Sequence, residues 1–323
     1  MMTLDEFLAE WHNDSPTVLV HTSGSTGQPK PMWVEKKRMM ASARITCDFL
    51  GLKAGDRALL CMSLDYIAGK MMVVRAQTCG LKLVSVKPTG APSWEGPIDF
   101  AAMVPMQVYN LLRTADGRAR LRSVSHLIIG GGAIDDALAQ ELKTFPHAVW
   151  STYGMTETLS HIALRRLSGP DASEWYTPFD GVHVAQTAEG CLMIDAPAVH
   201  EGTLVTNDIV ELRGSQFRVL GRKDNVVCSG GIKIQIEEVE RLLRAHLHAP
   251  FIVTKRKDEK FGEALVLMTE HADIDSQRLV CQELLPKYWQ PRYYQYVEHI
   301  PMTETGKPAR KDAERLAALS IEI

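Results

Sequence analysis

A short segment rich in hydroxyls and glycines ends in a lysine. It comprises Thr22, Ser23, Gly24, Ser25, Thr26, Gly27, Gln28, Pro29 and Lys30, and it follows an apolar β-branched run. Glycines let backbone N–H groups approach phosphate oxygens, and the hydroxyls and the lysine add donors and charge. Gly24 and Gly27 stand too close together for a Walker A loop. The composition predicts a phosphate-binding loop of another kind, with a plain surface loop as the alternative.

A second segment places three different chemistries within five residues. It reads Ser151-Thr152-Tyr153-Gly154-Met155-Thr156-Glu157-Thr158. Tyr153 offers a flat face for a purine, Thr156 offers a hydroxyl for a phosphate, and Glu157 offers a hard oxygen ligand for Mg2+. The alternative is a turn that leads into a helix capped by Thr156 or Thr158.

Alternating apolar runs and helix-compatible stretches surround these segments. The runs at 17–20, 59–62, 81–86, 101–104 and 126–129 predict strands. The stretches at 3–11, 35–50, 67–79, 106–112 and 135–143 predict helices. Strands that alternate with helices favour an α/β fold with a parallel sheet.

The chain changes character after residue 180. Short runs at 183–184, 191–194, 203–205, 209–212 and 217–220 follow each other closely and predict a mostly antiparallel β unit. A polar break at 221–224 precedes apolar residues at helical spacing over 236–247 and strands at 251–253 and 264–268. We therefore predict two domains, 1–223 and 224–323.

Composition excludes several classes of protein. The 323 residues carry 36 Lys and Arg against 39 Asp and Glu, and a net charge of −3 gives no support for a nucleic-acid binder. The six cysteines form no CxxC pair, which favours reduced core residues over a zinc or disulfide framework. No apolar run reaches the length of a membrane span, and the first residues do not form a signal peptide. We expect a cytoplasmic protein.

Taken in order, the motifs resemble those of the adenylate-forming superfamily of acyl-CoA synthetases, adenylation domains and luciferases. Besides the two segments above, the matching motifs are Gly130-Gly131-Gly132-Ala133, Thr206-Asn207-Asp208, Gly221-Arg222-Lys223-Asp224-Asn225, Ser229-Gly230-Gly231 and Thr305-Gly306-Lys307. The resemblance implies a large N-terminal α/β domain with a β-rich subdomain and a small mobile C-terminal α+β domain.

The resemblance also implies roles for individual residues. ATP, Mg2+ and coenzyme A would be bound, and the loop from Thr22 to Lys30 would hold the β- and γ-phosphates. The adenine pocket would be formed by Gly131, Gly132, Ala133, Tyr153 and Gly154. Asp208 and Arg222 would hold the ribose, Thr156 the α-phosphate and Glu157 the Mg2+. Lys307 would be the catalytic lysine and Asp224 the hinge, with Gly230 and Gly231 contacting coenzyme A.

One departure from the superfamily concerns the first subdomain. Most members carry a much longer segment before the phosphate loop than the 21 residues present here. We expect a shortened N-terminal domain. The alternatives for the missing wall are a partner subunit, a second copy of the chain, or a more open pocket.

The acid is suggested by a closer resemblance. Residues 221–240 and the stretches 103–109 and 128–134 look most like the 2-succinylbenzoate–CoA ligases of menaquinone biosynthesis. Their substrate is an aromatic dicarboxylate, and a guanidinium can hold the carboxylate that does not react. We expect Arg75, helped by Lys70, to be this anchor, with Tyr66 and His161 lining the acid pocket. The alternatives are solvated charges at 75 and 70 and a core histidine at 161.

These observations favour an ATP-dependent acid–thiol ligase. It would form an acyl-AMP with release of pyrophosphate, and then an acyl-CoA with release of AMP. Two alternatives stay open. One is another aryl or acyl adenylating enzyme that loads coenzyme A or a carrier protein, and the other is a non-catalytic nucleotide-binding remnant.

Overall fold

Contacts divide the chain into two compact units. The structure, a computed structural model, describes residues 2–21, 31–303 and 308–319. The first unit comprises Met1–Ala185, Met193–Val205 and Leu212–Arg218, and the second comprises Gln186–Leu192, Thr206–Glu211 and Val219–Ile323. The chain therefore passes between the units several times before residue 219, and no single cut of the sequence separates them.

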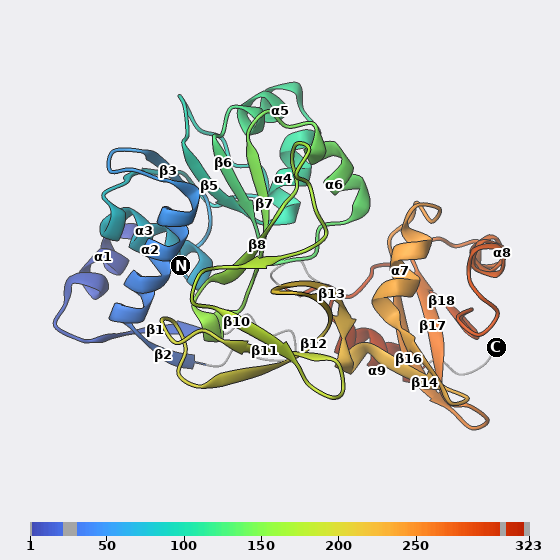
Figure 1. Ribbon diagram of the computed structural model, residues 1–323. Helices are drawn as coiled ribbons and strands as arrows, with labels where there is room; N and C mark the ends of the chain where they lie inside the picture. Colours follow the sequence, from blue (N-terminus) through green and yellow to red (C-terminus); the bar gives the residue numbers. More distant parts are fainter. Residues whose placement is uncertain (1, 22–30, 304–307, 320–323) are drawn as a thin grey trace. The chain divides into compact units, whose positions relative to one another are not determined.

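A seven-stranded sheet forms the centre of the first unit (Figure 1). Its order is β4-β3-β5-β6-β7-β8-β9, and the strands from β4 to β7 run parallel. β8 and β9 are antiparallel to their neighbours. The strands are β3 (Arg57–Leu60), β4 (Lys82–Ser85), β5 (Phe100–Met103), β6 (His126–Ile129), β7 (Ala148–Gly154), β8 (His161–Arg166) and β9 (Thr177–Pro178). The mixed α/β fold with a parallel sheet is confirmed.

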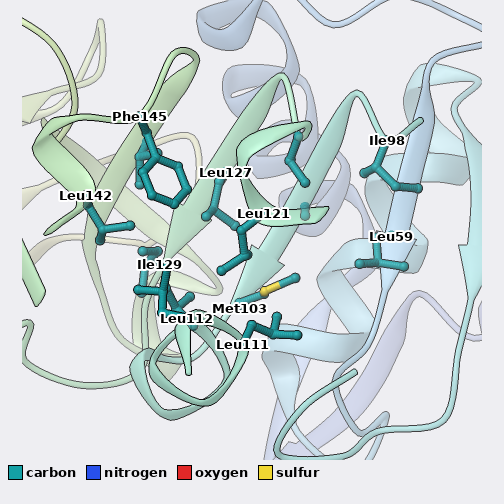
Figure 2. Packing of buried hydrophobic residues seen from close by; sticks show 14 of the residues in the cluster. Leu59, Ile98, Met103, Leu111, Leu112, Leu121, Leu127, Ile129, Leu142 and Phe145 are labelled. Atoms are coloured by element: carbon teal, nitrogen blue, oxygen red, sulfur yellow. The ribbon is translucent and has the colours of Figure 1, made fainter. Parts of the chain in front are cut away.

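Helices cover this sheet on both faces. The helices α4 (Pro105–Leu112), α5 (Ala115–Arg122) and α6 (Asp136–Lys143) contribute to the apolar cluster shown in Figure 2, where Leu112, Leu121 and Leu142 pack against Met103 and Leu127. Residues alternate across a strand, so Phe100 of β5 faces the opposite side from Met103. There Arg75 of α3 (Ile67–Cys79) lies over the Phe100 ring.

Two helices and a hairpin of the first unit precede the sheet in the sequence. The helix α1 (Leu4–His12) begins with a capping box between Thr3 and Glu6 and buries Phe7 and Trp11. A hairpin follows, in which β1 (Thr17–His21) pairs with β2 (Pro31–Glu35), and α2 (Lys36–Leu50) continues from it.

The predicted β-rich segment forms a four-stranded sheet in the order β10-β11-β12-β13. Its strands are β10 (His183–Gln186), β11 (Cys191–Asp195), β12 (Thr203–Arg213) and β13 (Gln216–Arg222). The prediction of separate strands at 203–205 and 209–212 was wrong, because β12 is continuous through Thr206-Asn207-Asp208. The polar residues in the middle of β12 break the apolar pattern without breaking the strand.

A second α/β layer structure makes up most of the second unit. The strands β14 (Val226–Ser229), β15 (Ile232–Gln235), β16 (Phe251–Asp258), β17 (Gly262–Thr269) and β18 (Tyr293–Tyr296) form one sheet. Leu265 and Leu267 of β17 face α7 (Ile236–Arg244) and α8 (Ile274–Leu284), whereas Val266 and Met268 face α9 (Arg310–Leu319). The predicted α+β composition is confirmed.

Two observations bear on the class of protein. All six cysteines are free thiols, as their spacing predicts. None of the helices in the described ranges combines the length and the apolarity that a bilayer crossing requires.

Candidate active site

Parallel strands of the first unit end at one edge of its sheet, and the predicted site residues follow them. Tyr66 lies beyond β3 at the start of α3, Gly131 follows β6, and Thr156 follows β7. The strand order reverses between β3 and β5, and open α/β sheets bind ligands at the carboxyl ends beside such a reversal. The structure thus brings these three predicted site residues to the edge where a ligand is expected.

Gly130 allows the ends of β6 and β7 to approach each other. A Cβ atom at this position would lie 2.2 Å from the Thr152 hydroxyl oxygen. Gly131 follows in the left-handed region, with φ of 79°, and Gly132 and Ala133 are exposed beyond it. The glycines therefore keep this stretch free of bulky side chains next to β7, and the adenine pocket stays a prediction.

Gly154 allows a second close approach, between β7 and β8. A Cβ atom here would lie 2.2 Å from the Ser160 carbonyl oxygen and 2.5 Å from the His161 Cα atom, both of which are backbone. The register of the two strands shifts between Tyr153 and Gly154. The chain can therefore fold back within six residues and present 155–160 as a tight turn.

We expect Gly154→Ala to lower the stability of the protein by about 1–3 kcal/mol, because an added methyl in a packed site forces the backbone apart. The measurement is the thermal unfolding midpoint. Gly132→Ala is the matched control, since its Cβ atom would meet only the Pro105 ring at 3.5 Å, an ordinary contact. Equal midpoints for the two variants would contradict the close approach.

The turn after Gly154 is locked by Thr158. Residues Thr156–Thr158 form a short 3-10 helix, and the Thr158 hydroxyl accepts the Met155 N–H at 3.0 Å. The same hydroxyl lies 2.8 Å from the Ser160 carbonyl oxygen, to which it can donate. Leu159 adopts a φ of 65°, which is costly for a residue with a Cβ atom. Buried Thr156 and half-buried Glu157 are thus held on a rigid, strained turn.

Tyr153 is packed more tightly than a purine platform needs to be. Its side chain is only 9% exposed. Its ring meets those of Tyr176 and Phe217 edge to face, with centroids 5.8 and 4.9 Å away. Most of the ring surface is therefore used in packing, and stacking on a purine stays a prediction.

A buried polar chain connects α3 to the segment after this turn. Arg75 donates from Nη2 to the Ser160 hydroxyl at 2.5 Å, and the Ser160 hydroxyl lies 3.2 Å from Nδ1 of His161. Nε2 of His161 lies 3.1 Å from the Thr46 hydroxyl of α2. Burial, together with the Arg75 charge, holds the pKa of His161 well below its usual value. His161 is therefore neutral at pH 7, and Arg75 is the charged member of this hydrogen-bonded series.

Arg75 is a cation in an apolar setting. It is 2% exposed, and burial lowers its pKa to about 10. Its Nε atom has no hydrogen-bond partner, and no carboxylate within the described residues pairs with it. The alternative that Arg75 is a solvated surface charge is wrong. An unpaired buried cation is costly, so this guanidinium is suited to an anion that the protein itself does not supply.

Lys70 does not join Arg75. Its ammonium donates to the Leu19 carbonyl oxygen at 2.9 Å and lies 3.6 Å from a Glu10 carboxylate oxygen and 5.3 Å from the centre of the Phe7 ring. It is 4% exposed, so the solvated alternative is wrong here too. Lys70 ties α3 to the N-terminal helix and hairpin, and the structure lends no support to a joint anchor.

His161 also borders a small cavity. Its volume is about 130 Å3, and Ser42, Phe179 and Val199 contribute to its lining. Typical ligand sites are larger, at about 300–1,000 Å3. The cavity alone therefore does not define the binding site.

The predicted ribose and hinge residues belong to the second unit. Their side chains form one hydrogen-bonded cluster together with that of Asn207. Arg222 donates to Asp208 at 3.1 Å and to Asp224 at 3.0 Å. The Asn207 amide donates to both Asp224 oxygens, at 3.2 and 3.3 Å. The sequence motif placed Asn207 beside Asp208 but gave it no role. Asp224, the predicted hinge residue, is therefore bonded both to Asn207 and to Arg222, which also holds Asp208.

Two further predicted site residues lie outside the clusters described above. Gly230 and Gly231 form the turn between β14 and β15, both with positive φ. The loop predictions for Thr22, Ser23, Gly24, Ser25, Thr26, Gly27 and Lys30, and that for Lys307, lie outside the described residues.

Comparison with known families assigns the class. The model of the AMP-binding enzyme family matches residues 5–193. This match covers more than half of the chain, so the chain belongs to the AMP-binding enzyme family.

Individual relatives are similar over most of the chain. The 2-succinylbenzoate–CoA ligase of Bacillus pumilus is 28% identical over 92% of this chain and 68% of its own length. The enzyme of the same name from Bacillus mycoides is 24% identical over 95% and 71%.

Solved structures agree with this family. An acyl-CoA synthetase (AMP-forming)/AMP-acid ligase II-like protein from Dyadobacter fermentans is 34% identical, with a TM-score of 0.65, over 97% of this chain and 92% of that one. The o-succinylbenzoate CoA synthetase of Bacillus subtilis, in complex with an acyl-adenylate intermediate, is 21% identical over 91% and 68%, with a TM-score of 0.76. The last likeness shows the fold alone.

Proposed function

We propose that this chain is an ATP- and Mg2+-dependent acid–CoA ligase that activates 2-succinylbenzoate. In the first step a carboxylate oxygen attacks the α-phosphorus of ATP and pyrophosphate leaves. In the second step the thiol of coenzyme A, having lost its proton, attacks the acyl carbon and AMP leaves. Family membership and the names of the relatives support the class, and the proposed substrate would make this a reaction of menaquinone biosynthesis.

Two anions must meet in the first step, so the site has to offset their repulsion. The proposed cationic groups are Lys30, in the phosphate loop, and Lys307, which would bridge the carboxylate and the α-phosphate. Glu157 provides a carboxylate on a rigid turn, which is a donor that suits Mg2+. A bound Mg2+ would neutralise phosphate charge and orient the leaving group.

Three side chains are proposed to bind the nucleotide. Thr156 would donate to the α-phosphate, and Asp208 would accept from the ribose hydroxyls while Arg222 orients its carboxylate. That orientation is supported by the 3.1 Å contact between Arg222 and Asp208. For the second step we propose that the backbone turns at Asp224, so that Lys307 leaves and Gly230 and Gly231 take up the thiol.

The single observation that carries the choice of acid is the unpaired guanidinium of Arg75. A dicarboxylate has one carboxylate to activate and one to be recognised, and a buried cation without a carboxylate partner is suited to the second. Ser160, the hydrogen-bond partner of Arg75, lies three positions after Glu157. This link supports a position for the acid next to the metal and phosphate groups, with His161 and Tyr66 beside it.

We expect pyrophosphate release from ATP and Mg2+ with 2-succinylbenzoate, and formation of AMP in a second phase only when coenzyme A is added. The measurement is a pyrophosphate assay over a panel that also contains benzoate and medium-chain fatty acids, each with and without coenzyme A. Turnover with a different acid would keep the class and reject the substrate. No release with any acid would contradict the ligase and favour a nucleotide-binding remnant.

A further inference from the structure

The hydrogen-bonded series that contains Arg75 extends further into the first unit than its first three members. It runs from Arg75 through the Ser160 hydroxyl and the His161 ring to the Thr46 hydroxyl, and it ends at the Ser42 carbonyl oxygen within α2. The contacts measure 2.5, 3.2, 3.1 and 3.1 Å in that order. We call this series the relay. Arg75, His161, Thr46 and Ser42 are all buried, so the relay connects α3, the start of β8 and α2 inside the protein.

The Ser42 end of the relay fixes the direction of every hydrogen bond in it. A carbonyl oxygen can only accept, so the Thr46 hydroxyl donates its single proton to Ser42. The Thr46 oxygen is then the acceptor for Nε2 of His161, which must carry a proton. A neutral imidazole has only one N–H group, so Nδ1 is bare and accepts the proton of the Ser160 hydroxyl. The Ser160 oxygen is left to accept from the Arg75 guanidinium.

A charged imidazole would break this proton order. With a proton on each ring nitrogen, both His161 and Arg75 would donate to the Ser160 oxygen, and the Ser160 proton would lose Nδ1 as its acceptor. Two positive groups would also meet at one hydroxyl. Burial and the Arg75 charge hold the pKa of His161 well below its usual value, so the ring is neutral at pH 7. The relay therefore has one arrangement of protons at this pH.

The relay orients the guanidinium without neutralising it. Apart from Arg75, its members are uncharged groups that accept or donate single hydrogen bonds. A carboxylate partner would instead compensate the charge, as Glu10 does for Lys70 on the same helix. The Nε atom of Arg75 still has no hydrogen-bond partner. The relay thus holds the cation in place and leaves its charge for a ligand.

The relay also ties Arg75 to the turn that carries Glu157. The Ser160 N–H donates to the Thr158 carbonyl oxygen at 2.7 Å, and the Thr158 hydroxyl lies 2.8 Å from the Ser160 carbonyl oxygen. Thr158 is the last residue of the 3-10 helix Thr156–Thr158. The residue that accepts from Arg75 is therefore fixed to this short helix, and the separation between the guanidinium and Glu157 is set by rigid contacts.

We propose that Thr46 and His161 are positioning residues that set the specificity of the site for the second carboxylate of the acid. By fixing the proton order, they make Ser160 an acceptor for Arg75 and hold the guanidinium at one distance from the turn. The relay then selects acids whose two carboxylates have the matching separation. This inference rests on the proposed function, because that function supplies the carboxylate that Arg75 binds.

The proton order is tested on the protein alone, without any substrate. Correlation spectra of protein labelled with 15N-histidine distinguish a ring nitrogen that carries a proton from a bare one. The signals of His161 are those that disappear in His161→Gln. At pH 7 we expect a proton on Nε2 of His161 and a bare Nδ1.

The role in recognition is tested with Thr46→Val, which leaves Nε2–H of His161 without its acceptor. We expect the KM for 2-succinylbenzoate to rise about 5- to 10-fold, the effect of one hydrogen bond. The kcat should stay within about 2-fold, because the reacting carboxylate lies at the other end of the acid. The KM for 4-oxo-4-phenylbutanoate, which lacks the ring carboxylate, should change by less than about 2-fold.

Two further variants separate the hydroxyl from its surroundings. Thr46→Ser keeps the hydroxyl and should restore the KM for 2-succinylbenzoate to within about 2-fold of the unmodified enzyme. Thr78→Val is the matched control. It removes from α3 a hydroxyl that has no hydrogen-bond partner among the described residues, and it should change neither KM.

The proposal is overturned by a proton on Nδ1 of His161 in place of Nε2, or by an unchanged KM for 2-succinylbenzoate in Thr46→Val. Equal rises in KM for both acids, or a Thr46→Ser enzyme as impaired as Thr46→Val, would reduce the relay to packing. An unmodified enzyme that releases no pyrophosphate with 2-succinylbenzoate would reject the proposed function, and the specificity role with it, even where His161 carries the expected proton. The substrate-free spectrum therefore distinguishes a failure of the proposed function from a failure of the proton order.

Discussion

The Lys307→Ala enzyme should lose acid-dependent pyrophosphate release by at least about 100-fold, the usual effect of removing one charged group that stabilises a transition state. In that step a carboxylate and a phosphate approach each other, and the lysine is the cation proposed to lie between them. Formation of acyl-CoA from supplied acyl-AMP should stay within a few-fold of the unmodified enzyme, because both negative reactants of the first step are then already joined.

The two rates would be measured separately, by pyrophosphate release with ATP and acid, and by acyl-CoA formation from acyl-AMP and coenzyme A. Lys287→Ala removes an exposed lysine of the same unit and should change neither rate. Equal losses of both rates in Lys307→Ala would reject the idea that the lysine serves only one step. Retention of both rates would assign the adenylation chemistry to another cation.

The parts of the fold that depend on local pattern were predictable from the sequence. The runs at 101–104 and 126–129 became the neighbouring parallel strands β5 and β6. Gly80 marked the end of the helix at 67–79, and the apolar spacing over 236–247 predicted α7, which ends earlier, at Arg244. Each depends on residues a few positions apart, which is the range over which periodicity carries information.

Interactions between distant residues were not predictable in this way. Glu240 and Arg310 are 70 positions apart, and nothing in either neighbourhood signals that they pair. The same holds for Lys70, whose partner Glu10 belongs to the first helix. The sequence could nominate Lys70 as a charge near Arg75, but only the packing of α3 on the hairpin reveals that its charge is already used. Charged residues inside an apolar helix are therefore best assigned by their partners.

The turn after β7 was predicted as a functional motif, but the sequence did not explain its geometry. The motif Tyr153-Gly154-Met155-Thr156-Glu157 was recognised as chemistry, but its physical reason lies in Gly154, where no Cβ atom fits against the Ser160 carbonyl. A sequence does not reveal which glycine is needed because another part of the backbone passes close by, and which because its φ angle is positive. Once the contact is known, Thr156 and Glu157 can be assigned to the tight turn that joins β7 and β8.

We expect Arg75→Met to separate stability from function. An unpaired buried cation carries a desolvation cost, so a methionine of comparable length should leave the thermal unfolding midpoint unchanged or raise it. The kcat/KM for 2-succinylbenzoate should fall about 100-fold, because a buried charge-assisted hydrogen-bonded pair is worth about 2–3 kcal/mol. With 4-oxo-4-phenylbutanoate, which lacks the ring carboxylate, the variant and the unmodified enzyme should differ little.

Lys70→Met is the comparison variant for Arg75→Met, because it removes a buried cation that has a carboxylate partner. Lys70 is as buried as Arg75, but its charge already has Glu10 and the Leu19 carbonyl as partners. Its loss takes the ammonium donor from the Leu19 carbonyl oxygen and the cation from the Glu10 carboxylate. It should therefore lower the stability by about 1–3 kcal/mol, without a preference between the two acids. Equal losses with both acids in Arg75→Met, or a midpoint that falls as far as that of Lys70→Met, would mean that Arg75 is held by the fold and not by the substrate. A loss confined to the dicarboxylate, at unchanged stability, would mean that the protein keeps an unpaired cation in its interior because the acid supplies the missing charge.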